Sequence, residues 1–230
     1  MTVWYEWNLL TRQKNEKMKN LITILIIISS NLVFTQVKNQ EIIGSKVETI
    51  ENGKIENGVY ICNLFDWKIT IPEGYELIKK ERIEELEKKG YEAIKKETTE
   101  GIAINRHPPH LIGFQLNKYN YFNSSLETLV GTKKFTLEEH KLFCEKLLKE
   151  TYSTIKGLKF ELTKSDLKLG KHDFYKIKVK IYSEKDDVYL LTQEIYYSFI
   201  NNNLFSASLN YTNEEVGLIL QYNFEKSFQN

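Results

Sequence analysis

Two cysteines and four histidines are the side chains of this 230-residue sequence that would most readily carry out chemistry. Cys144 follows His140 by four positions, a spacing that places both side chains on one face of a helix and suits a thiol with its base. A working nucleophile also needs an orienting group and oxyanion donors, and the sequence shows neither. We therefore expect His140 and Cys144 to be packing residues. The sequence also lacks a glycine-rich phosphate loop, a Gly-x-Ser-x-Gly elbow and a His-Glu-x-x-His helix.

Cys62 and Cys144 are the only cysteines, so the chain can form one internal disulfide at most. In an oxidising compartment the two thiols can pair, provided that their Cα atoms lie within about 7 Å of each other. Cys62 falls in a predicted strand and Cys144 on the inward stripe of a predicted helix, which suits two buried free thiols equally well. Both alternatives stay open.

The remaining histidines are His107, His110 and His172. His107 and His110 flank two prolines in a stiff loop. A structural metal site needs about four ligands, and no cysteine or carboxylate cluster lies beside this loop, so we expect no metal and no other cofactor. His172 lies at the entry to a strand and is typical of a turn. The alternative is a hydrolase or isomerase whose site gathers His107, His110 or His172 with a glutamate from distant parts of the chain.

Two groups of side chains are candidates for a partner surface. The first is a row of lysines on one face of a strand, which suits either a solvated sheet face or a docking site for an acidic partner. The second is a set of aromatic residues around a loop, which suits either core packing or a protein interface. The residues are Lys176, Lys178 and Lys180 in the first group, and Tyr119, Tyr121 and Phe122 in the second.

Hydrophobic periodicity predicts the elements that must position these residues. Alternation with period two, clearest at 172–182, predicts strands at 59–62, 67–71, 111–116, 119–130, 159–169, 172–182, 188–200 and 204–211. Helical spacing predicts helices at 81–96, at 136–155 behind a Thr136/Glu139 capping box, and after Thr212. In the last helix Val216, Ile219, Leu220, Phe224 and Phe228 share one face. The prediction is an α+β fold in which an antiparallel sheet of about six or seven strands is flanked by three helices.

The register of the lysine-bearing strand follows from the turn after it. If Tyr182 lies opposite Val188, antiparallel counting places Lys176 opposite Glu194, a favourable cross-strand pair.

This order of elements resembles the PsbP-like α/β/α-sandwich superfamily, which includes small bacterial envelope proteins. The resemblance covers roughly residues 59–228, and its local signature is the stretch from Trp67 to Tyr75, WKITIPEGY. It implies a binding or assembly module without catalysis of its own. It carries over no ligand residues, because proteins of one fold need not share a site.

The segment from Leu21 to Phe34 decides on which side of a membrane the rest of the chain works. As a helix it would be about 21 Å long, short of a bilayer core of roughly 30 Å. A methionine and a lysine at 18–19 precede it and a small residue, Thr35, follows, which is the outline of a secretory signal peptide. We expect a start-site extension at 1–17, a signal peptide at 18–35, a flexible lead or short hairpin at 36–58, and one domain at 59–230. The alternative is a retained membrane anchor.

The charge balance narrows the choice of partner. From Gln36 onward the chain carries 28 basic and 29 acidic side chains. Nucleic-acid binding and strong membrane adsorption both require a basic excess, so we expect neither; the membrane would be reached only through Leu21 to Phe34 if that segment is uncleaved. Together these observations predict an exported, periplasmic or extracellular, non-catalytic module that binds an envelope protein.

Overall fold

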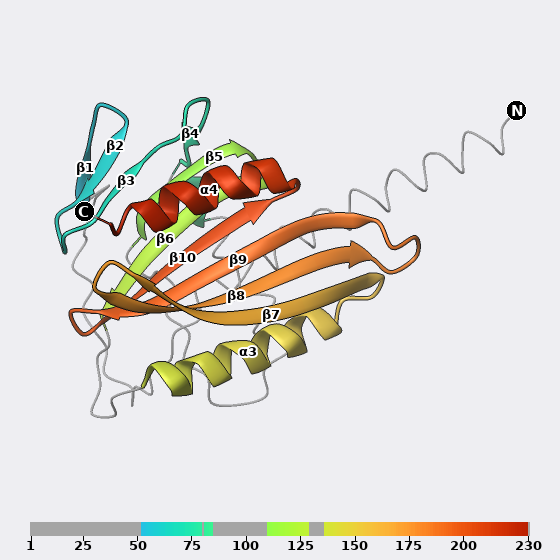
Figure 1. The fold of residues 1–230 in the computed structure, drawn as a ribbon. Coiled ribbons are helices and arrows are strands. Elements are labelled where there is room, and N and C mark those ends of the chain that lie inside the picture. Colours follow the sequence, from blue (N-terminus) through green and yellow to red (C-terminus); the bar gives the residue numbers. More distant parts are fainter. Residues whose placement is uncertain (1–51, 80, 85–109, 129–135, 230) are drawn as a thin grey trace, which may run out of the picture.

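The computed structural model describes residues 52–79, 81–84, 110–128 and 136–229. Their main element is a seven-stranded sheet with the order β4-β5-β6-β10-β9-β8-β7 (Figure 1). Every pair of neighbouring strands is antiparallel, which confirms the predicted sheet. The strands are β4 (Glu76–Leu77), β5 (His110–Asn117), β6 (Asn120–Thr128), β7 (Leu158–Leu169), β8 (His172–Ser183), β9 (Tyr189–Ile200) and β10 (Asn203–Tyr211).

Short turns connect the long strands and set their order. Asn117 Oδ1 accepts hydrogen bonds from the two backbone N–H groups at positions 119 and 120, at 3.0 and 3.1 Å. Gly170, between β7 and β8, has φ +56°, and Asn201 and Asn202, between β9 and β10, have φ 51° and 64°. Glycine and asparagine adopt this left-handed conformation more easily than other residues. The turns that the sequence predicts at these positions are therefore confirmed.

A second, three-stranded sheet packs beside the first. It consists of β1 (Gly53–Glu56), β2 (Val59–Cys62) and β3 (Lys68–Thr70), in that order. Asn57 and Gly58 have φ 51° and 74° and close a tight turn between β1 and β2. Residues 53–58 therefore form the first strand and the turn of a hairpin whose second strand is the predicted one at 59–62.

Two helices cover opposite faces of the seven-stranded sheet (Figure 1): α3 (Leu137–Ser153) lies on one face and α4 (Glu214–Lys226) on the other. The predicted capping box begins α3. Glu139 N–H donates to Thr136 Oγ1 at 3.2 Å, and Thr136 N–H donates to the Glu139 carboxylate at 2.9 Å.

The cap of α4 differs from the prediction. Asn213, not Thr212, accepts the hydrogen bond from the N–H of Val216, at 2.9 Å. Thr212 N–H donates instead to Asn120 Oδ1 at 2.8 Å, a contact that joins the end of β10 to the start of β6. The sequence alone does not reveal that Thr212 binds Asn120, which is distant in the chain, instead of capping the helix.

The other predicted elements are only partly within the described residues. Residues 81–84 are helical, and the rest of the predicted helix at 81–96 lies outside the described ranges. The extension at 1–17, the signal-like segment at 18–35 and His107 also lie outside them. Among the described residues, none of the helices has the length and apolar character needed to cross a bilayer.

The core has two parts, one on each face of the seven-stranded sheet. On the α3 face, aliphatic residues of β8 and β9 pack with Tyr175, Tyr197 and Cys144. On the α4 face, an aromatic cluster around Phe205 and Phe224 joins the large sheet to the small one. A further group fastens the far end of α4, because Trp67 Nε1 donates to Ser227 Oγ at 2.8 Å and the Trp67 ring stacks on Phe228 at 6.0 Å.

Candidate functional site

The thiol and imidazole that share a face of α3 are both sealed in the core. Cys144 Sγ lies 3.6 Å from His140 Nδ1, and the same nitrogen is 2.6 Å from the Tyr175 hydroxyl. Both side chains are buried. Burial raises the pKa of the Cys144 thiol to about 12, although hydrogen bonds with Tyr175 and Tyr197 oppose the shift. Because the thiolate is the reactive form, a thiol with this pKa is an inert packing group at neutral pH.

The other histidines in the described ranges do not meet. His110 is half-buried on β5, where its Nε2 lies 2.6 Å from Asn123 Oδ1, and burial lowers its pKa to about 4. His172 begins β8, where burial also lowers its pKa and its ring packs on Phe228. Strands β6, β10 and β9 lie between β5 and β8, a separation of roughly 19 Å. Among the described residues no group of three or more histidine, cysteine or acidic side chains is placed to hold a metal ion.

The disulfide alternative is wrong for the two cysteines. Cys62 belongs to β2 and packs in the cluster on the α4 face, whereas Cys144 belongs to α3 and packs in the cluster on the opposite face. Both are buried free thiols. The seven-stranded sheet separates them, so they cannot approach to the distance that a disulfide needs.

The lysine row lies on the sheet face that α4 covers, and its charges are largely neutralised there. Lys178 Nζ lies 2.9 Å from Glu194 Oε1 and Lys176 Nζ lies 3.6 Å from Glu194 Oε2. Lys180 Nζ lies 3.5 Å from Glu214 at the start of α4. The row is therefore a structural link between β8, β9 and α4 rather than a free docking stripe.

Glu194 is the centre of this charge network. The hydroxyls of Tyr196 and Tyr211 donate to its carboxylate at 2.8 and 2.9 Å. The residue has no exposed surface, and burial alone would raise its pKa. The attraction of Lys176 and the hydrogen bonds from Lys178 and Tyr196 outweigh burial and lower the pKa instead. Glu194 is thus ionised and fully coordinated by the protein.

The register of β8 against β9 at Glu194 differs from the prediction. Lys178, not Lys176, lies directly opposite Glu194, and Lys176 lies opposite Tyr196. Two shifts of one residue each cause the difference: Tyr182 lies opposite Tyr189 and not Val188, and the pairing is irregular at Ile181/Tyr182. Simple counting from the turn cannot include this bulge.

The predicted aromatic surface is mostly inside the protein. Tyr121 and Phe122 are both buried, and Phe122 stacks on Phe114 at 4.8 Å. Neighbouring residues of a strand point to opposite faces, and both faces of β6 are covered at this point. These two residues are therefore not a partner surface. Tyr119, in the turn, is half-exposed beneath the Lys118 ammonium, 4.8 Å from the ring centroid.

The surface that the sequence analysis missed lies on the outside of α4. Leu218, Ile219 and Tyr222 are 65, 41 and 62% exposed, while Leu220 and Phe224 face the sheet. Ile219, which was predicted to face inward, points outward instead. The signal was present in the sequence: apolar residues at 218, 219 and 222 form a second stripe beside the inward one at 216, 220 and 224.

Gly217 and Tyr211 show how tightly the inner face of α4 is seated. A Cβ atom added at Gly217 would lie 2.5 Å from the Tyr211 ring. The helix therefore approaches β10 at a distance that only glycine permits, which fixes which side of α4 faces the sheet and which faces solvent.

Comparisons with known proteins add a likeness of architecture only. No family model matches the chain, and no curated protein matches it significantly. The chain is similar to the solution structure of cyanobacterial PsbP from Synechocystis sp. PCC 6803, with 9% sequence identity and a TM-score of 0.45. The match covers 81% of this chain and 95% of that one. The PsbP-like resemblance predicted from the sequence is thus supported as a weak architectural one, and it assigns no ligand or partner.

Proposed function

We propose that this chain is an exported, non-catalytic binding and assembly module of the bacterial cell envelope, and that the outer face of α4 is its binding surface. The observation that carries the proposal is that Leu218, Ile219 and Tyr222 are exposed side by side on a helix whose other face is fixed to the sheet. Single exposed apolar residues are common on monomers, but a contiguous group suggests an interface.

The arrangement of α4 suits binding for two reasons. Tyrosine at position 222 provides a rigid aromatic anchor of the kind that contributes much of the energy in protein interfaces. The helix is also held at both ends, by Asn213 at its start and by the Trp67 contact to Ser227 at its end. A rigid element loses little entropy on docking.

The reactive groups in the described ranges support a non-catalytic role. The Cys144 thiol is protonated and enclosed, His140 is bonded to Tyr175, and the Glu194 carboxylate is neutralised by two lysines. Each of these groups already has its partners within the protein. Such groups stabilise the fold and leave no activated nucleophile or base for a substrate.

The export part of the proposal rests on the sequence of residues 18–35. Its apolar run is short for a membrane span and follows a basic start, as in a secretory signal peptide. The alternative, a chain anchored in the membrane by Leu21 to Phe34, places the same domain in the same compartment. In both cases the partner is an envelope protein and not a nucleic acid, because the charge of the domain is balanced.

Photo-cross-linking in living cells tests both parts of this proposal. The amino acid p-benzoylphenylalanine would replace Leu218 on α4 and, in a matched control, Leu142 on α3, which is 64% exposed. We expect a discrete protein product from position 218 and none from position 142, with an N-terminal peptide of the bait that begins near Gln36. Equal products or none at both positions would contradict the binding surface. A bait that retains Leu21 to Phe34 would favour the anchored alternative.

A further inference from the structure

The exposed residues of α4 form one continuous stripe with a regular spacing. We define the outer stripe as Glu215, Leu218, Ile219, Tyr222 and Lys226, all of which are exposed. On a helix with 3.6 residues per turn, these five positions fall within an arc of about 100°. Spacings of three and four residues of this kind are typical of a seam between two packed helices.

The order of charges along the outer stripe is as informative as its apolar centre. Its first member is the acidic Glu215 and its last is the basic Lys226, which follows Glu225 at the end of the helix. Leu218, Ile219 and Tyr222 lie midway between them. When the stripe is turned end to end so that Glu215 meets Lys226, Ile219 meets Tyr222. The stripe is therefore complementary to its own reverse.

We propose that the partner of the outer stripe is a second copy of this chain, with the two α4 helices packed antiparallel about a two-fold axis. This inference rests on the proposed function and identifies its partner. A two-fold interface uses the same patch on both subunits, so the patch must be self-complementary. In the antiparallel arrangement Glu215 lies opposite the partner's Lys226, twice. The parallel arrangement is disfavoured because it would place like charges together.

The size of the helix sets the strength of the association. Helix α4 has thirteen residues and is about 20 Å long. A seam of this length buries less than a standard interface of roughly 1,200–2,000 Å². The dimer is therefore a weak and concentration-dependent one, which suits a component that assembles where its local concentration is high.

Sedimentation velocity over a range of concentrations tests the proposal with the full chain in the form in which it is isolated from cells. We expect a monomer–dimer equilibrium. Leu218→Asp should raise the dissociation constant by at least about tenfold, because it places a charge in the apolar centre of the seam. Leu142→Asp on α3 should leave the constant unchanged, since Leu142 is equally exposed but lies outside the outer stripe.

Reversing the charges at positions 215 and 226 distinguishes the antiparallel two-fold dimer from other modes of association. Glu215→Lys alone and Lys226→Glu alone should each raise the dissociation constant by about threefold to tenfold, because each creates two like-charge pairs. The double variant restores both pairs with reversed sign and should return to within about twofold of the wild type. A double variant as weak as the product of the single ones would overturn the antiparallel arrangement.

The two proposals fail in different ways. A chain that stays monomeric at every concentration, while position 218 still cross-links to a different protein in cells, overturns the dimer and leaves the binding surface intact. A monomer that also gives no product at position 218 overturns both. Products of twice the mass of the chain, which contain only its own peptides, support both.

Discussion

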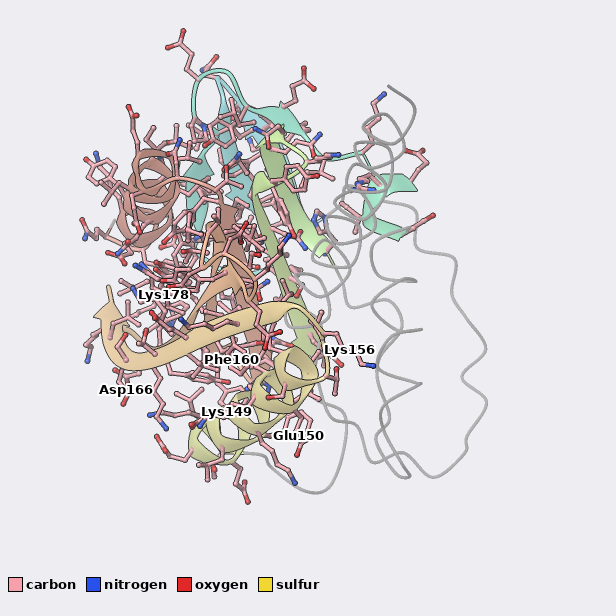
Figure 2. The ribbon with its side chains drawn as sticks, turned by 90° about the vertical axis from the view of Figure 1, so that its right-hand side faces the viewer. Lys149, Glu150, Lys156, Phe160, Asp166 and Lys178 are labelled. Atoms are coloured by element: carbon pink, nitrogen blue, oxygen red, sulfur yellow. The ribbon has the colours of Figure 1, made fainter. Side chains whose placement is uncertain are left out.

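Helices α3 and α4 cover opposite faces of one sheet, but they distribute their polar and apolar side chains in opposite ways. The outside of α3 is charged: Lys149 pairs with Glu145 at 2.8 Å, and Lys141 pairs with Asp166 of β7 at 2.7 Å. Figure 2 shows Lys149 and Glu150 on this side of the sheet and Lys178 on the side that faces α4. The outside of α4 is apolar at its centre.

The faces of the sheet beneath the two helices also differ in the polarity of their side chains. Beneath α3 lie several neutral polar groups, including the Tyr152 hydroxyl, which donates to Gln193 at 2.9 Å. Gln193 in turn donates to Asn210 at 3.2 Å. Beneath α4 lies an aromatic cluster together with the ionised network of Glu194. Both helices close the core, and the exposed apolar centre of α4 is the feature on which the proposed binding surface rests.

The largest expected effect comes from truncating the inner face of α4. Phe224→Ala should lower the free energy of unfolding by about 3 to 5 kcal/mol, because it opens a cavity at the centre of the aromatic cluster. Leu148→Ala, the matched change beneath α3, should cost about 3 kcal/mol. Urea unfolding followed by circular dichroism measures both. A cost below about 1 kcal/mol for either variant would mean that the helix does not close the core.

The next effect compares a buried ion pair with an exposed one. Glu194→Gln should lower the free energy of unfolding by about 2 kcal/mol, since it leaves Lys176 and Lys178 half-buried without a counter-charge. Asp166→Asn, which breaks the exposed pair on the α3 side, should cost less than about 1 kcal/mol. The same urea titration separates them. Equal costs would show that the Glu194 network does not differ from a surface pair.

Acid should weaken the two faces of the sheet in different pH ranges. His110, on the α3 face, is neutral in the folded protein until about pH 4, while the unfolded chain takes up a proton near pH 6.5. Stability therefore falls as the pH falls from about 6.5 to about 4, by about 1 to 2 kcal/mol for a half-buried group. Glu194 has a lowered pKa, so its contribution is complete above the ordinary carboxyl pKa and is lost below it.

Unfolding curves at several pH values check this order. His110→Gln should reduce the loss between about pH 6.5 and 4, leaving the part that His172 contributes, and keep the loss at lower pH. Glu194→Gln should reduce the loss at lower pH and keep the loss between about pH 6.5 and 4. A wild-type stability that is flat from pH 7 to pH 5, or a His110→Gln variant with an unchanged pH profile, would contradict the assignment of the first range to this histidine.

The smallest expected effect on stability comes from substitutions at the exposed leucines of α3 and α4, and it tests whether the two outer helix faces have different roles. Leu142→Ser and Leu218→Ser should each change the free energy of unfolding by less than about 0.5 kcal/mol, because both side chains are exposed. Only Leu218→Ser should weaken association. A stability loss above about 1 kcal/mol at position 218 would indicate that the residue belongs to the core and not to an interface.

Much of the fold was predictable because local patterns determine it. Period-two alternation located the long strands, and the Thr136/Glu139 pair located the start of α3. The register of Lys178 and Glu194 was not predictable, because it depends on the length of the turn and on a bulge, neither of which leaves a mark in the alternation. The burial of Tyr121 and Phe122 was also hidden, since a strand covered on both faces buries both sets of residues.

The sequence contained the information needed to predict the exposed apolar surface of α4, but the predicted helix face did not include that surface. A helix with apolar residues at 216, 220 and 224 and again at 218, 219 and 222 has two apolar sides, and only one of them can face a sheet. The predicted inward face includes Ile219 with Leu220 and Phe224, and it leaves Leu218 and Tyr222 unassigned. The geometry of α4 on β10, set by the contact between Gly217 and Tyr211, decides which stripe is inward, and that contact is tertiary.

The contact of Trp67 with the end of α4 also provides a fluorescence probe of the intact domain. A chain that begins near Gln36 contains one tryptophan, whereas the full sequence contains three, the others at positions 4 and 7. The Trp67 indole is buried against Phe205 and bonded to Ser227. In a chain that begins near Gln36, tryptophan fluorescence therefore comes from a single indole at the junction of the small sheet and α4. A red shift of that emission signals the separation of this junction, and the tryptophan absorbance per molecule distinguishes a chain that keeps positions 4 and 7 from one that begins after them.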